Sequence, residues 1–156
     1  MTAQVHVDIQ VASDSKQLPE SSDIECWAAA AVGGNRDEAE VSLRIVDLEE
    51  GAELNFQWRQ KEGPTNVLSF PSDLPEELNL PLLGDLVICA PVVEREAKEQ
   101  GKTLTSHWAH MIVHGTLHLQ GYDHIQDDEA EEMEALETSI MQTLGFDDPY
   151  QVREEI

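Results

Sequence analysis

Apolar and polar residues alternate along two segments in the first third of the chain. This alternation, from Val5 to Val11 and again from Val41 to Ile45, is typical of strands that bury one face. Two short apolar runs follow at Val67–Phe70 and Leu82–Ala90, and their lengths suit two further strands. The pattern therefore predicts four strands.

Five other segments carry the start and stop residues of helices. Ser, Thr and Asp are favoured at the cap before the first turn, proline within that turn, and glycine just after the last turn. By these signals the expected helices run from Pro19–Ser22 to Val32, from Asp47 to Arg59, from Pro91 to Gly101, from Thr103 or Thr105 to Leu119, and from Asp127 or Asp128 to Gly145.

The order of these elements predicts an α+β fold, with about five helices packed on a small mixed four-stranded sheet. At 156 residues the chain fits one domain, 1–156, because a single core buries enough surface at that length. The proline-rich stretch PSDLPEELNLP is expected to form a loop over the site, and residues 146–156 a loose tail.

The last expected helix is amphipathic. Its apolar stripe consists of Met133, Leu136, Ile140, Met141 and Leu144. The acidic run from Asp127 to Glu137 has the composition of a second metal cluster, but its spacing favours a solvated face opposite the apolar stripe.

Composition changes the expected partners more than the expected fold. The chain has 32 acidic residues against nine lysines and arginines, a net charge of −23 that repels polyphosphates at long range. An RNA-binding protein of this composition needs a local cation, a metal or a partner to hold its substrate. Cys26 and Cys89 form no metal motif, and no basic leader or long apolar run occurs, so a reducing cytoplasm and no membrane are expected.

The run HGTLHLQGYDH carries the strongest chemical signal, three histidines that can meet at one ion: His114, His118 and His124. The first two project from one helical face a single turn apart, and Gly121 lets the helix stop so that the third returns. Three neutral imidazoles leave a zinc-type ion one position for water, which predicts metal-dependent hydrolysis. His107 and His110 are expected to pack or to support the ligands, because a fourth ligand would close the site.

The same histidine frame occurs in metzincin proteases, and one residue argues against that class. Those enzymes carry a glutamate after the first histidine as the general base, and this chain has Gly115 there. Peptide hydrolysis would need a replacement base, for which Asp85 and Asp123 are the candidates.

From His114 to His124 the chain resembles the YbeY endoribonuclease family, whose signature is HGxLHLxGYDH. Further pieces stand in that family's order and intervals: Leu54 and Asn55, Arg59, PTNVLSFP at 64–71, and Leu83 to Asp85. The resemblance covers most of the chain. It departs at Asn66, where the family more often has aspartate, and at Gln120.

This resemblance implies a zinc-dependent, single-strand-specific endoribonuclease of ribosomal RNA processing, acting in 3′-end maturation of small-subunit ribosomal RNA and in ribosome biogenesis. It implies ribosomal RNA, the small ribosomal subunit and assembly factors as partners, in the bacterial cytoplasm. One ion is expected, zinc or another divalent transition metal. A metal suits this chemistry, because it polarises a phosphoryl oxygen or lowers the pKa of bound water.

Arg59 and His114 are the expected catalytic residues. Arg59 ends the second expected helix just before a loop, its planar fork suits a phosphate, and it matches the family's functional arginine. Weaker candidates for contacts to substrate, or for orienting a histidine or water, are Lys61, Ser69, Asp85 and Asp123.

Two other functions remain open at this point. The heavy acidic charge and the ribosomal association of the family fit a non-enzymatic assembly factor, in which the metal only staples the fold. The shared histidine frame fits, less well, a metzincin-like protease. Metal removal separates the first alternative from an enzyme, since a stapled chain unfolds without its ion.

Overall fold

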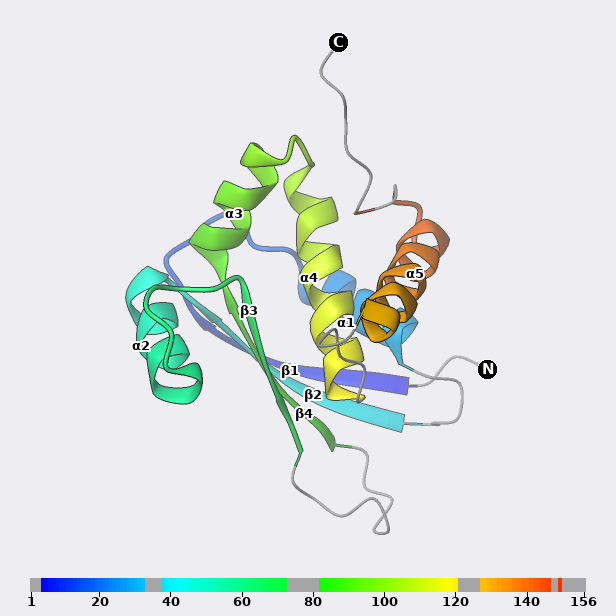
Figure 1. The fold of residues 1–156 in the computed structure, drawn as a ribbon, viewed down its shortest axis with the longest axis horizontal. Coiled ribbons are helices and arrows are strands. Elements are labelled where there is room, and N and C mark those ends of the chain that lie inside the picture. The colour runs from blue at the N-terminus through cyan, green and yellow to red at the C-terminus, as the bar shows by residue number, and fades with distance from the viewer. Residues whose placement is uncertain (1–3, 33–37, 73–81, 121–126, 147–148, 150–156) are drawn as a thin grey trace.

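The computed structural model describes residues 4–32, 38–72, 82–120, 127–146 and 149. Four strands and five helices lie along these ranges (Figure 1). In chain order they are β1 (Gln4–Ala12), α1 (Ser21–Ala31), β2 (Glu38–Val46), α2 (Leu48–Arg59), β3 (Val67–Pro71), β4 (Leu82–Cys89), α3 (Ala90–Glu99), α4 (Leu104–Leu119) and α5 (Asp127–Thr143).

The strands form one mixed sheet in the order β1-β2-β4-β3. Strands β1, β2 and β4 run parallel, while β3 pairs antiparallel with β4 and forms an edge of the sheet. The prediction of an α+β fold with a mixed four-stranded sheet and about five helices is confirmed.

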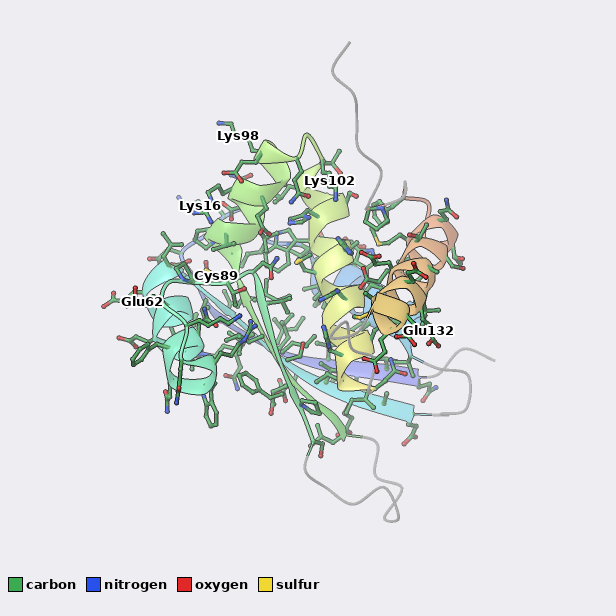
Figure 2. The ribbon with its side chains drawn as sticks, viewed as in Figure 1. Lys16, Glu62, Cys89, Lys98, Lys102 and Glu132 are labelled. Atoms are coloured by element: carbon green, nitrogen blue, oxygen red, sulfur yellow. The ribbon has the colours of Figure 1, made fainter. Side chains whose placement is uncertain are left out.

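Two helices, α1 and α4, cover one face of the sheet, and α5 packs on α4 (Figure 1). The main core lies between these layers and takes alternate residues of the strands, such as Leu86 and Ile88 of β4. The intervening residues Val87 and Cys89 belong to a smaller cluster on the other face, where α2 and the start of α3 pack. Figure 2 shows Cys89 between these two helices.

Helix ends mostly follow the sequence signals. Thr103 caps α4, its side chain accepting a hydrogen bond from the amide of Ser106 at 3.1 Å. Asp47 occupies the cap position of α2, but its carboxylate instead accepts from Ser13 Oγ at 2.5 Å and from the amide of Asp14 at 3.0 Å. Those bonds lower the pKa of Asp47 and tie the end of β1 to the β2–α2 junction.

Two expectations concern segments that are largely outside the described residues. The loop expected over the site covers 71–81, of which 73–81 are not described. Of the expected tail, Phe146 lies edge-on to Trp27 at a centroid distance of 6.3 Å, and most of the remainder is not described. No helix within the described ranges has the length and hydropathy needed to span a bilayer.

Candidate active site

A cavity of about 680 Å³ opens where the end of α2 meets the edge strand β3 and the second half of α4. Four residues singled out from the sequence line it together: Arg59, Ser69, His114 and His118. Helices α2 and α4 lie on opposite faces of the sheet, so the two groups of side chains meet across β3. A mixed polar and apolar cavity of this size is typical of a ligand site.

The histidines come from one face of α4, because residues four apart lie one above the other on a helix. The ring centroids of His114 and His118 are 4.7 Å apart, with the planes inclined by 78°. Both side chains are partly buried at the cavity wall. The third predicted ligand, His124, lies outside the described residues, as do Gly121 and Asp123.

Glu137 of α5 is a site residue that the sequence pattern missed. Its carboxylate is fully buried and accepts a hydrogen bond from His114 Nδ1 at 2.6 Å and another from His110 Nε2 at 2.7 Å. The expectation of a solvated Glu137 was wrong. Glu132, five residues earlier on the same helix, is exposed and points away from the core (Figure 2).

A signal for this burial was present in the sequence. Glu137 is four residues after Met133 and four before Met141, both of which are fully buried, so it lies within the apolar stripe of α5. A carboxylate is stable at such a position only when donors satisfy it, and the two histidines supply them.

The contact with Glu137 fixes the protonation pattern of His114. A carboxylate only accepts hydrogen bonds, so Nδ1 carries the proton and Nε2 presents its lone pair. Metal-binding histidines usually donate their second nitrogen to a carboxylate in this way. Burial lowers the pKa of His110, against the opposing effect of its hydrogen bond with Glu137.

Asn66 lines the cavity just before β3 and links this strand to α3 and α4. Its Nδ2 donates to the carboxylate of Glu96 in α3 at 3.1 Å, and the same carboxylate bonds His107 Nε2 of α4 at 3.0 Å. The bond from His107 is the main cause that lowers the pKa of Glu96. His107 therefore anchors α4 to α3, which fits the expected packing role.

Gly115 is the position at which a metzincin carries its glutamate. A β-carbon built there would lie 2.7 Å from Leu86 Cδ2 and 3.3 Å from Val67 Cγ2. The glycine thus lets α4 approach the sheet closely enough for its histidines to reach the edge strand. A glutamate at this position has no space in the packed interface.

The remaining candidates differ in how they lie relative to the cavity and the histidines. Ser69 pairs with Leu86 across the β3–β4 ladder and shares its face, the face that α4 covers. Asp85 is exposed and, as the neighbour of Leu86 along β4, points to the opposite face from the histidines. Lys61 is exposed just after α2 and is not among the described residues that line the cavity.

The described residues fit a metal in two ways, and both use His114. The ligand atoms of His110, His114 and Glu137 lie within 4.8 Å of one another and could hold an ion in the interior. Their present separations are those of hydrogen bonds, which an ion would have to replace. The other set pairs His114 with His118 at the cavity wall, where Glu137 would support one ligand and a bound ion would be open to the cavity.

Comparison with known proteins adds two similarities. A family model described as endoribonuclease YbeY matches residues 8–145. The solution structure of TM1509 from Thermotoga maritima superposes with a TM-score of 0.57 at 26% sequence identity, over 94% of this chain and 99% of that one.

Proposed function

Because the chain belongs to the YbeY endoribonuclease family, we propose that it hydrolyses phosphodiester bonds of single-stranded RNA at the cavity between α2 and α4. The proposed ion is zinc, held by His114, His118 and His124. The proposed process is ribosomal RNA maturation, at the 3′ end of the small-subunit RNA, in the cytoplasm and in contact with the small subunit and its assembly factors.

One observation carries this proposal: an arginine, which can bind a phosphate, and two histidines, which can bind a metal, line the same cavity. Arg59 reaches it from α2, and His114 and His118 reach it from α4. A guanidinium offers two parallel donors to a phosphate, so Arg59 would hold the RNA backbone beside the histidines. In a chain of charge −23, such a local cation is what an RNA substrate requires.

Each residue has a separate task in this proposal. Bound zinc would supply Lewis acidity and a water of lowered pKa. Glu137 keeps the proton of His114 on Nδ1, so that Nε2 is available as a ligand atom. Ser69, on the covered face of β3, would donate a hydrogen bond to a non-bridging phosphate oxygen.

The test measures zinc content and RNA cleavage on the same samples. His114→Ala should lose both bound zinc and cleavage. Arg59→Glu should keep zinc and lose cleavage by about 100-fold or more, because it replaces a phosphate clamp with a repelling charge. Undiminished cleavage by His114→Ala would show that the histidine site is not catalytic.

A metal-stapled assembly factor is the second candidate, and the buried set His110, His114 and Glu137 favours it. An ion there would have no open position toward substrate, since His110 and Glu137 are buried. This candidate requires that metal removal unfolds the chain, as followed by circular dichroism. An apo form that stays folded and loses only cleavage would exclude it.

A further inference from the structure

Trp58 is a large apolar side chain left in water at the edge of the cavity. The chain has three tryptophans, of which Trp27 is 5% and Trp108 is 1% exposed, whereas Trp58 is 62% exposed. Trp58 lines the cavity together with Arg59, His114 and His118. Exposed indole surface beside convergent polar groups marks a binding site better than isolated surface hydrophobicity does.

The indole is already oriented by a second aromatic ring. Trp58 and Phe70 of β3 meet edge-on, with ring centroids 5.6 Å apart and planes inclined by 65°. Such a contact restricts the rotation of the side chain and still leaves most of its surface in solvent. A ligand that stacks on Trp58 therefore loses little affinity to ordering the indole.

The chemistry of these neighbours selects an unpaired nucleobase. Single-stranded nucleic acids bind by stacking bases on aromatic rings while cations hold the phosphates. Electrostatic attraction is weak in a chain with nine lysines and arginines against 32 acidic residues, and stacking does not depend on net charge. Trp58 and Arg59 are consecutive, so one ring and one cation reach the cavity from the same turn of α2.

We propose that Trp58 is a stacking site for an unpaired RNA base, and that it positions the strand so that the adjoining phosphate meets Arg59. The inference rests on the proposed RNA-cleaving function and adds how the substrate is held. Stacking accepts all four bases, so the site selects single strands over duplexes without reading sequence.

The test compares three variants of the zinc-loaded protein: Trp58→Ala, Trp58→Phe and Phe56→Ala. Phe56 is the matched control, because it is 61% exposed on the same helix and is not among the described residues lining the cavity. The probes are a single-stranded RNA decamer and a decamer of abasic residues with the same phosphates. Binding is recorded by stopped-flow tryptophan fluorescence ahead of cleavage, and by anisotropy of end-labelled probes.

We expect the RNA decamer to quench the exposed tryptophan of the wild type, and the abasic decamer to leave it unchanged. Trp58→Ala should weaken RNA binding by about 5- to 150-fold, the range for one stacked base, and should not alter binding of the abasic probe. In cleavage assays the loss should appear mainly in KM. Trp58→Phe should recover part of the affinity, and Phe56→Ala should behave as wild type.

RNA affinity of Trp58→Ala within about twofold of wild type would overturn the inference. Equal quenching by the abasic probe, or quenching by an unstructured peptide in place of RNA, would overturn it as well. RNA binding with the expected quench but without cleavage would support the stacking site and refute the proposed function alone. RNA cleavage by Trp58→Ala at the wild-type rate and KM would support the proposed function and refute the stacking site alone.

Discussion

At the scale of single residues, Glu137 has the largest expected effect on the histidines. It is fully buried, and its carboxylate bonds both His110 and His114. Glu137→Gln keeps the volume but turns one acceptor into a donor, which conflicts with a protonated Nδ1 of His114. We expect zinc affinity to fall by about 10- to 100-fold, as for other carboxylates that support a metal-binding histidine.

Competition with a fluorescent chelator measures that affinity directly. Glu132→Gln is the matched control, because it removes an exposed carboxylate from the same helix. Equal zinc affinity in Glu137→Gln and wild type would mean that His114 does not depend on this contact.

Asn66 offers a test of pH dependence. Hydrogen bonds hold the pKa of Glu96 below its usual value, so its ionised form stabilises the fold above about pH 4.5, and this stability is lost as the pH falls through the lowered pKa. Asn66→Asp replaces a donor with a second carboxylate beside Glu96. We expect a loss of about 1–3 kcal/mol at neutral pH, which shrinks in acid as the carboxyls become protonated.

Urea unfolding at several pH values measures this loss. The double variant Asn66→Asp with Glu96→Gln restores one donor and one acceptor and should recover part of the stability. A loss that is constant from neutral pH to pH 4 would refute the electrostatic explanation.

At the scale of elements, two glycines set how closely the site helix and the edge strand approach β4. Gly84 has φ of +147°, and a β-carbon there would lie 2.3 Å from the carbonyl oxygen of Phe70. At Gly115 the nearest contact is a side-chain methyl of Leu86, at 2.7 Å. A clash with backbone displaces β3, whereas a clash with a side chain is relieved by local repacking.

We therefore expect Gly84→Ala to lose about 3 kcal/mol or more of unfolding free energy, and Gly115→Ala about 1–2 kcal/mol. Thermal unfolding ranks the two variants. Gly101→Ala is the control for backbone conformation alone, since Gly101 has φ of +66° and no atom within 4 Å of its β-carbon position. Gly84→Ala no less stable than Gly101→Ala would contradict the close approach of β3.

The element scale is also where the sequence was most informative. Caps, prolines and glycines act locally, so the start of α4 at Thr103 and the glycine after α5 at Gly145 were predictable. Burial of Glu137 was less evident, because composition favoured solvation and only its place between Met133 and Met141 argued otherwise. The direction of Asp85 depends on strand pairing, which a single sequence does not specify.

At the scale of the whole molecule, strand order creates the site. Sequence order does not reveal that β4 lies between β2 and β3, which leaves β3 at the edge with a helix on each side. The cavity that unites Arg59 with the histidines follows from this arrangement. The family resemblance predicted that Arg59 and the histidines act in one site. The spacing of residues in the sequence predicted only that the histidines lie together.

The net charge predicts that RNA affinity depends only weakly on salt concentration. Each phosphate that a cation neutralises on a single strand contributes about −0.7 to the slope of log affinity against log salt. Contacts from Arg59 and Lys61 alone would give a slope no steeper than about −1.5, and screening of the repulsion between RNA and a chain of charge −23 would make it shallower. Anisotropy titrations between about 50 and 300 mM KCl measure the slope. A value of about −3 or steeper would require additional cations.

Helix α2 holds the proposed RNA-binding half of the site with little anchorage. Its described buried residues are Gly51 and Asn55, whereas α4 buries eleven. Opening of α2 would therefore cost far less free energy than unfolding of the core. We expect its amides to exchange with deuterium orders of magnitude faster than those of α4, and to slow when RNA binds. Equal protection of both helices would exclude such opening. If α2 does open in this way, the enzyme could release a cut strand by loosening one helix, while the histidines stay in place for the next substrate.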